Sequence, residues 1–181
     1  MSVETKLPDR ALSFAMRAHT GQFRKDGETP FIHHPISVAR GLMEAGITCE
    51  VTLAAALLHD VLEDTPTTFE ELQAAFGRDV AELVAELSDD KSLPQAERKR
   101  LEVLHTKTAS ERAKRIKMAD KRENLLDILE RPASGWSAER CREYFEFART
   151  VVESASGAHD GLELRFYETY RRGLSEMGLK V

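Results

Sequence analysis

The chain has 181 residues, a length that suits one domain and lets it bury about two-thirds of its unfolded surface. Hydrophobic residues make up 41% and charged residues 31%, an ordinary globular balance, and no apolar run has the length of a membrane span. The net charge of −5 argues against a partner that is nucleic acid or anionic lipid. We therefore expect a single domain over residues 1–181, in which local cations or a metal meet any anionic ligand.

The N-terminus and the cysteines do not suggest export from the cell. The opening string MSVETKLPDR has no apolar stretch behind a basic cap, so it does not resemble a secretion signal. Cys49 and Cys141 lie far apart and have no CxxC partner, which argues against a disulfide framework and against a zinc knuckle. We expect a cytoplasmic protein.

Apolar residues recur at helical spacing along most of the chain, and the alternation typical of strands is nearly absent. This pattern predicts an all-α fold, a helical bundle of roughly eight to ten helices. Thr68 with Glu71 forms a capping box before one helix, and Gly77 stands where that helix ends. Thr108 with Glu111 matches the same box and predicts the start of another helix.

A long helix is predicted from about residue 110 to residue 130, stopped by Pro132, and a further helix is expected to start at Ser137. Two stretches, 21–35 and 88–95, break the helical pattern with glycine, proline and short polar residues. Because ordered loops often carry function, we expect these two loops to line one site.

The strongest local signal is the string ALLHDVLED, an apolar approach followed by four ionisable residues. On a continuing helix His59 would share a face with Glu63, and Asp60 would share a face with Asp64. An isolated His-Asp pair is more often a helix end that meets solvent. Burying all four groups requires compensation, which a divalent cation bound by imidazole and carboxylates supplies.

Two further segments add residues of the same chemistry. In FIHHP the chain leaves a loop and enters a helix, so one of His33 and His34 is expected to point inward and the other outward. In KMADKREN, the spacing places Lys117, Asp120 and Asn124 on one helical face. Alone, Asp120 would be read as an exposed carboxylate paired with Lys117.

Taken together, these residues resemble the His…HD…D metal-binding signature of the HD superfamily. The strings GQFRKDGETPFIHHPI, ALLHDVLEDT and KMADKRENL resemble the hydrolase half of RelA/SpoT-type enzymes. DDKSLPQAERKRLEV and GWSAERCREYFEFA are similar to the stand-alone small alarmone hydrolases related to the metazoan SpoT homologue. The resemblance runs from about Ala11 to Val152 and implies a single HD-type helical bundle.

The resemblance implies removal of the 3′-pyrophosphate from (p)ppGpp, which gives GDP or GTP. Glu63 and Asp64 would be the catalytic acidic pair, beside one Mn²⁺ that acidifies water and polarises a phosphoryl oxygen. The implied metal ligands are His34, His59, Asp60 and Asp120. The implied substrate contacts are Arg24, Lys25, Asn124, Arg140 and Tyr144.

Three of the implied substrate contacts also have a structural alternative. Arg24 and Lys25 alone would be read as a solvated basic loop. Tyr144 would be read as packing with Phe145 and Phe147 in an aromatic-rich helix.

The sequence departs from the family pattern at four positions near these motifs. Phe31 stands where relatives often have tyrosine, and Gln95 stands where a lysine is expected, which weakens one phosphate contact. Arg122 and Glu123 replace an apolar-aromatic pair and are expected to reshape the wall beside Asn124.

Other candidates receive a structural interpretation. His19, His105 and His159 lie outside the signature and are expected on the surface or in helix packing. Trp136 is expected to anchor a helix entry. The mixed charges of the run 97–102 predict a solvated, salt-bridged helix face.

Two other functions remain open from the sequence. The same metal-dependent chemistry would serve an enzyme for another nucleotide, such as NADPH or a deoxynucleotide. A nucleotide-binding regulator without turnover is the third possibility, although the intact acidic and metal-binding residues argue against it. The donor set accepts Mn²⁺, Fe²⁺ or Zn²⁺, and the sequence leaves the oligomeric state open.

Overall fold

A computed structural model describes residues 6–133 and 135–178. Residues 1–5, on which the reading of the N-terminus partly rests, lie outside the described residues. All regular elements within the described ranges are helices, which confirms the predicted all-α fold. They are α1 (Leu7–Ala18), α2 (His33–Glu44), α3 (Glu50–Leu58), α4 (Val61–Asp64), α5 (Phe69–Phe76), α6 (Arg78–Leu87), α7 (Gln95–Thr108), α8 (Glu111–Glu130), α9 (Ala138–Ser154) and α10 (Asp160–Glu176).

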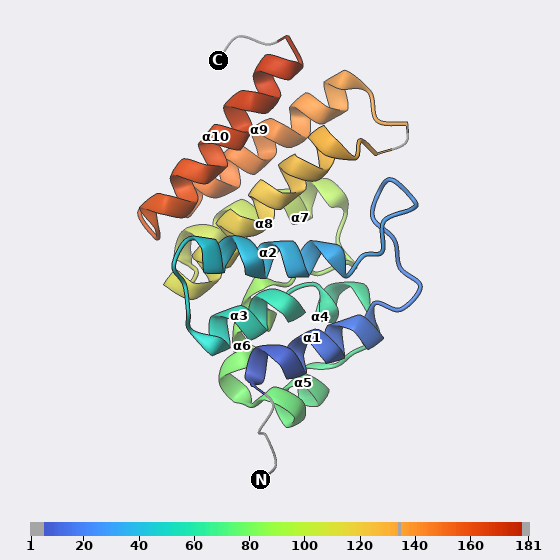
Figure 1. The fold of residues 1–181 in the computed structure, drawn as a ribbon, viewed down its shortest axis with the longest axis vertical. Helices are drawn as coiled ribbons and strands as arrows, with labels where there is room; N and C mark the ends of the chain where they lie inside the picture. Colours follow the sequence, from blue (N-terminus) through green and yellow to red (C-terminus); the bar gives the residue numbers. More distant parts are fainter. Residues whose placement is uncertain (1–5, 134, 179–181) are drawn as a thin grey trace.

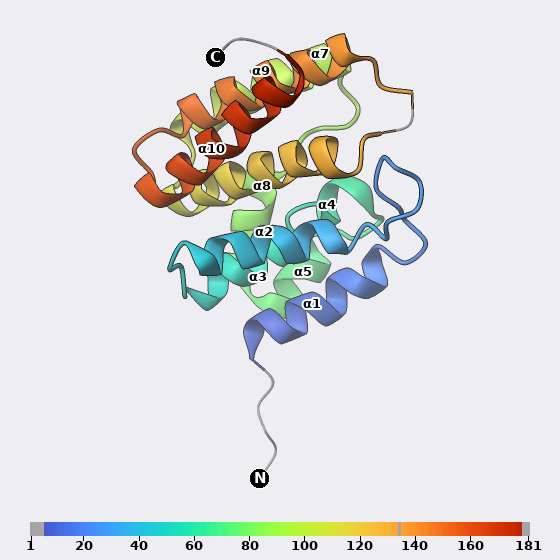
Figure 2. The same cartoon turned by 45° about the horizontal axis from the view of Figure 1, so that its top comes forward.

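The helices stack in an order that puts α2 and α8 in the middle of the molecule. Helix α8 packs against α2 on one side and against α9 and α10 on the other, while α3 packs against α1, α2 and α6 (Figure 1). The turned view in Figure 2 shows the same succession, with the loop that leads into α2 beside α4. The α2–α8 contact therefore joins the two halves of the stack.

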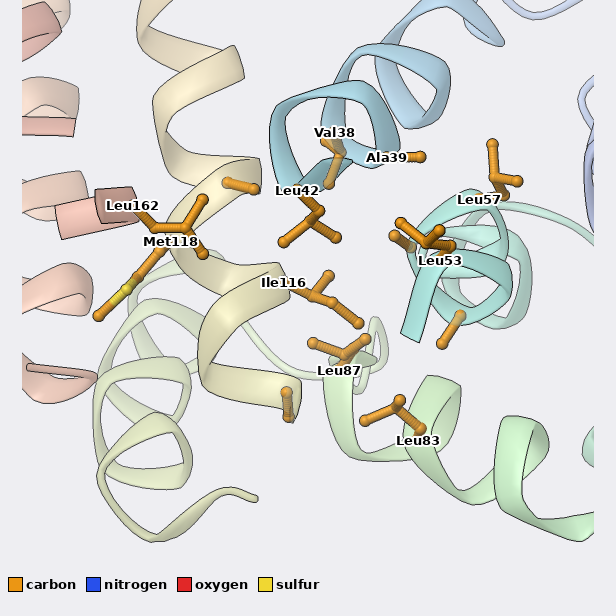
Figure 3. Close-up of a cluster of buried hydrophobic side chains, with 14 of the residues drawn as sticks. Val38, Ala39, Leu42, Leu53, Leu57, Leu83, Leu87, Ile116, Met118 and Leu162 are labelled. Atoms are coloured by element: carbon orange, nitrogen blue, oxygen red, sulfur yellow. The ribbon is translucent and has the colours of Figure 1, made fainter. Parts of the chain in front are cut away.

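Helix α3 is apolar on all sides, as expected of a helix in the core. Every residue from Thr52 to Leu58 is buried. Figure 3 shows Leu42 of α2 and Ile116 of α8 meeting next to side chains of α3 and α6. The ionisable residues that follow Leu58 therefore begin inside the protein, where the buried helix ends.

Most predicted helix ends are confirmed. Thr68 and Glu71 form the reciprocal capping box, and Gly77 ends α5 with a φ of 84°, a conformation that glycine adopts freely. Ser137 caps α9 by accepting a hydrogen bond from the Arg140 amide. Helix α8 ends at Glu130, two residues before Pro132.

Two predictions about helix ends are wrong. Thr108 is the last residue of α7, and Ser110 caps α8 by accepting a hydrogen bond from the Ala113 amide at 3.2 Å. Ser110 is fixed there because its own amide and hydroxyl both bond to the carboxylate of Glu86. The helix predicted to continue through ALLHDVLED instead ends at Leu58 and resumes at Val61, so it breaks at the site.

None of the helices in the described ranges has the length and apolar character needed to cross a membrane.

Candidate metal centre and its cavity

Three side chains from separate helical segments converge in the core. His34 lies in the first turn of α2, His59 directly follows α3, and Asp120 lies in the middle of α8. The predicted split at the start of α2 is confirmed, because His33 is exposed and His34 is buried. Each of the three side chains offers a ligand atom, and these atoms lie within 4.8 Å of one another.

The geometry centres on one oxygen of Asp120. Its Oδ1 lies 3.0 Å from Nε2 of His34 and 3.7 Å from Nε2 of His59. Asp60 adds a nearby carboxylate, whose Oδ2 lies 3.2 Å from His59 Nε2 and 3.8 Å from His34 Nε2. Two imidazoles and one or two carboxylates form a donor set suited to a divalent transition metal.

The hydrogen bonds around His59 direct its free nitrogen to this point. Nδ1 donates to the carbonyl of Ala56 at 2.7 Å, so in the neutral imidazole Nε2 is the nitrogen with the lone pair. Nε2 is buried and makes no hydrogen bond among the described residues. A buried nitrogen without a partner is costly unless something binds it, and a metal ion fits this requirement.

The charges around these residues also favour a cation. Burial alone would raise the pKa of Asp120, but the ammonium of Lys121 and the two histidines hold it well below its usual range. Burial alone would lower the pKa of His59, yet the carboxylates of Asp60 and Asp120 raise it to about 9. A proton on His59 therefore takes the place of positive charge that a metal would bring.

The other oxygen of Asp120 is held by a buried charge network. Lys121 Nζ lies 3.1 Å from Asp120 Oδ2 and 2.7 Å from Oε1 of Glu102, which also accepts a hydrogen bond from Lys117 at 3.1 Å. Asn124 donates to Asp120 Oδ1 at 2.6 Å. The carboxylate cannot rotate without breaking these bonds, so its orientation is fixed.

The acidic pair on α4 lies beside the metal-ligating group. Glu63 Oε1 lies 3.7 Å from the Arg98 guanidinium, and Lys91 forms an ion pair with Asp64. Burial, together with the charges of Asp60 and Asp89, raises the pKa of Glu63. A carboxylate with a raised pKa is a stronger base, which suits proton transfer from water.

These groups line a cavity of about 320 Å³. Residues from both predicted loops contribute to it, among them Arg24 and Phe31 from the first loop and Asp89 and Lys91 from the second. The prediction that the two loops line one site is confirmed.

Arg24 is anchored in the wall of this cavity. Its Nε donates to Asp127 at 2.7 Å and its Nη2 donates to Asn124 at 2.9 Å, while the guanidinium lies 5.4 Å from the ring centre of Phe31. The predicted alternative of a solvated arginine is wrong, because its side chain is only 10% exposed.

Lys25 and Tyr144 line both the main cavity and an adjoining one. Lys25 Nζ lies 5.1 Å from the ring centre of Tyr144 and 4.8 Å from that of Trp136. Tyr144 packs against Phe147 and Trp136 and still lines the cavity. Arg140 lies over Trp136 at 4.5 Å and lines an adjoining cavity of about 330 Å³, shared with Lys25 and Tyr144.

The departures from the family pattern fall in different places. Phe31 and Gln95 line the main cavity. Arg122 and Glu123 form an ion pair at 2.6 Å and line a separate cavity between α2 and α8. The expectation that this pair reshapes the wall beside Asn124 is therefore wrong, since the two side chains leave α8 on its other face.

Sequence reasoning missed the contribution of α7. Glu102 was expected on a solvated face, but it is 7% exposed and pairs with Lys117 and Lys121. A signal for this contribution was available in the sequence, because polar residues stand at i, i+3, i+4 and i+7 counted from Gln95, the last residue of the second loop. This spacing places four polar residues on one face of α7, and all four line the cavity: Gln95, Arg98, Lys99 and Glu102.

The remaining histidines differ from one another. His105 is exposed, and His159 caps α10 by accepting a hydrogen bond from the Leu162 amide, as expected for residues outside the signature. His19 is buried against the loop that follows α1 rather than in helix packing.

A buried two-histidine, one-carboxylate group at the centre of a helical bundle defines the class of protein. Residues 11–137 match the family model described as HD domain, and the chain belongs to this family.

Within the family the chain is of the MESH1 type. It is 49% identical over 168 residues to the Homo sapiens protein named guanosine-3′,5′-bis(diphosphate) 3′-pyrophosphohydrolase MESH1, covering 91% of this chain and 94% of that protein. The Drosophila melanogaster protein of the same name is 48% identical over 166 residues, 90% of this chain and 93% of the relative. The Escherichia coli K12 bifunctional (p)ppGpp synthase/hydrolase SpoT is 40% identical over 140 residues, 70% of this chain and 20% of SpoT.

Solved structures agree with this placement. A structure described as a metazoan orthologue of SpoT that hydrolyses ppGpp has a TM-score of 0.89 and 44% identity, covering 95% of this chain and 98% of that one. The crystal structure of lmo0812 from Listeria monocytogenes has a TM-score of 0.66 and 28% identity, covering 79% and 94%. The resemblance read from the sequence motifs is confirmed.

Proposed function

We propose that this protein is a metal-dependent 3′-pyrophosphohydrolase of guanosine 3′,5′-bis(diphosphate) and its (p)ppGpp relatives. The products would be GDP or GTP and pyrophosphate. The observation that carries the proposal is the buried His34, His59 and Asp120 group beside the Glu63–Asp64 pair in one cavity with a cationic rim. The names of the MESH1 relatives, which the chain matches over most of their length, support this substrate.

We propose Mn²⁺ as the resident metal, with Asp60 as a fourth ligand beside the three buried ones. The hydrogen-bonded imidazole and the anchored carboxylate described above fit such an ion. When bound, it supplies a more acidic water and polarises the phosphoryl oxygen under attack. Imidazole and carboxylate ligands also accept Fe²⁺ and Zn²⁺, so the metal must be measured.

We assign the proton transfer to the acidic pair. Glu63, with its raised pKa, accepts a proton from the attacking water, and Asp64 orients that water. The water oxygen joins the phosphorus next to the ribose, and the bond from that phosphorus to the ribose 3′ oxygen breaks. The departing 3′ oxygen then takes the proton that Glu63 accepted from the water, which restores the hydroxyl and the Glu63 carboxylate.

Cations around the cavity would hold the phosphates. Arg98 lines the cavity next to Glu63, and its Nε is buried and makes no hydrogen bond among the described residues. Lys91, Lys99 and the predicted contact Lys25 add positive charge along the same wall. These charges would offset the negative charge that builds on the transferred phosphate.

We assign the binding of the guanine base to Arg24. Its two hydrogen bonds to Asp127 and Asn124 fix the plane of the guanidinium, which packs on Phe31. A fixed planar cation is a suitable stacking surface for a purine. Tyr144 and Arg140, at the adjoining cavity, are proposed to contact the ribose side and the distal phosphates.

Some predictions about the whole protein stay predictions. These are a single domain over residues 1–181, a cytoplasmic address, and a guanine nucleotide as the partner without nucleic acid or membrane.

The test is a substrate panel with the purified protein and Mn²⁺. Samples of ppGpp, NADPH and deoxynucleoside triphosphates are incubated separately, and the products are resolved by ion-exchange chromatography. Formation of GDP and pyrophosphate, abolished by a chelator, supports the proposal. A preference for NADPH or a deoxynucleotide would replace the substrate, and no product from any nucleotide would favour a binding regulator.

A further inference from the structure

One buried titratable side chain near the acidic pair has no role in the proposed mechanism. His19 directly follows α1 and is only 3% exposed. Its ring stacks on Phe31 with centroids 4.6 Å apart, and the rings of Phe31 and His34 form a T-shaped pair with centroids 6.1 Å apart. His19 therefore lies one side chain away from a predicted metal ligand.

Hydrogen bonds continue from His19 to the catalytic segment. Nδ1 of His19 lies 2.7 Å from Oε1 of Gln22, and Nε2 of Gln22 donates to the main-chain carbonyl of Asp64 at 2.7 Å. The carbonyl can only accept, so the Gln22 amide must present its NH₂ to Asp64 and its oxygen to His19. That oxygen also only accepts, so the proton of the neutral imidazole must be on Nδ1.

The remaining nitrogen of His19 fits this assignment. Nε2 is buried without a hydrogen-bond partner among the described residues. Burying an acceptor nitrogen without a hydrogen-bond partner costs less than burying an N–H donor without one. Buried acceptors that lack partners are accordingly more common in proteins than buried donors that lack them. Burial also lowers the pKa of His19, which keeps the ring neutral at neutral pH.

Helix α4 needs support from outside itself. It has four residues, Val61–Asp64, too few to satisfy its own carbonyls. The hydroxyl of Thr65 donates to the carbonyl of Val61 at 2.7 Å, and Gln22 donates to that of Asp64. Gln22 is thus the tether, 42 positions away in sequence, that joins the loop after α1 to the end of α4.

We propose that His19 and Gln22 are positioning residues that hold the Glu63–Asp64 segment in register with the metal ligands. We call the hydrogen-bonded pair of His19 and Gln22 the brace. The inference rests on the proposed function, because the acidic pair that the brace holds is the proposed catalytic pair. His19 fixes the amide of Gln22, the amide fixes Asp64, and Phe31 links the same imidazole to His34. Neither residue is among those that line the main cavity.

Two substitutions at His19 separate hydrogen bonding from packing. His19→Phe keeps an aromatic ring against Phe31 but removes the donor, whereas His19→Asn loses the ring and places an amide N–H where Nδ1–H was. We expect kcat for ppGpp to fall about tenfold or more in His19→Phe, with KM and bound metal unchanged, as for other residues that orient catalytic groups. His19→Asn should keep kcat within about threefold of the wild type.

A third variant tests whether the two residues act as one unit. Gln22→Leu should lower kcat as much as His19→Phe, and combining both should lower it no further. Wild-type kcat in a folded His19→Phe variant would overturn the inference. So would a His19→Asn variant that falls as far as His19→Phe, because packing alone would then explain the effect.

A spectroscopic measurement stands apart from turnover. Imidazole ¹⁵N chemical shifts, assigned to His19 with the His19→Asn variant, should show the proton on Nδ1 at neutral pH. A proton on Nε2 of His19 would contradict the proposed brace even if the enzyme is active. The Nδ1 form in a protein that leaves ppGpp intact would keep the brace and reject the proposed function.

Discussion

At the scale of single residues, the site separates groups that would bind metal from groups that would move protons. The buried Nε2 of His59 points toward the other metal-ligating residues. Glu63 lies beside that group and pairs with Arg98. We expect His59→Ala to lose both bound metal and turnover. Glu63→Gln should keep the metal and lose about 10²- to 10⁴-fold in kcat, the usual effect of removing a general base.

Metal content by mass spectrometry and turnover of ppGpp, measured on the same samples, check this pair of variants. The surface variant His105→Ala is the control, since His105 is exposed and away from the cavity. Wild-type activity in Glu63→Gln would show that the proton acceptor is a different group.

Protons and metal should compete for His59. Its pKa of about 9 in the metal-free protein means that the imidazole is protonated at pH 7.5, and a metal binds only the neutral form. The pKa values of His34 and Asp120 are lowered, so neither carries a proton to release there. Metal binding at pH 7.5 should therefore release about one proton, and affinity should rise with pH up to about 9.

Calorimetric titration with Mn²⁺ in two buffers of different ionisation enthalpy measures this release. The released proton should disappear above about pH 9.5, where His59 is already neutral. Equal heats in both buffers at pH 7.5 would contradict the protonated state assigned to His59.

At the scale of helices, the packing of α10 depends on a glycine. A Cβ built on Gly173 would lie 2.1 Å from Cε1 and 2.5 Å from Cζ of Phe145, which is fully buried in α9. We expect Gly173→Ala to destabilise the protein by about 1–3 kcal/mol through overpacking, in spite of the better helix propensity of alanine.

Urea denaturation followed by circular dichroism measures the change. The matched control is Gly41→Ala in α2, where the nearest atom to a new Cβ is Oε1 of Glu123 at 3.7 Å, an ordinary contact. Gly41→Ala should be neutral or stabilising by up to about 1 kcal/mol. A loss of stability in both variants would show that helix α10 has no special requirement for glycine.

The sequence predicted the helices well, and it also predicted that His34, His59 and Asp120 come together, since apolar spacing and local motifs are visible in neighbouring residues. It failed where the cause lies far along the chain. The helix break after Leu58 delivers His59 and Asp60 to partners on α2 and α8, and no local signal marks it. Glu102 is buried because Lys117 and Lys121 on α8 neutralise it, a pairing between helices that the charge pattern of α7 alone does not show.

At the scale of the whole molecule, a bound metal would join segments that are otherwise connected by packing. The ligand atoms come from α2, the α3–α4 junction and α8. Binding to the folded state alone stabilises it by about 2.7 kcal/mol when the free metal is at 100 times its dissociation constant. We expect Tm to rise by roughly 5–10 °C on adding Mn²⁺ to metal-free protein.

Thermal scans of chelator-treated and reloaded protein check this expectation. His59→Ala is the control and should show no metal-dependent shift. An equal shift in that variant would place the stabilising ion elsewhere on the molecule.

The separation of the ligands along the chain also has a consequence for synthesis. His34 and Asp120 are 86 positions apart, and both must be present with His59 before the three donors can meet. A growing chain therefore has no complete metal site until Asp120 has left the ribosome exit tunnel. Metal loading through these three donors therefore begins only after the first 120 of the 181 residues have been made.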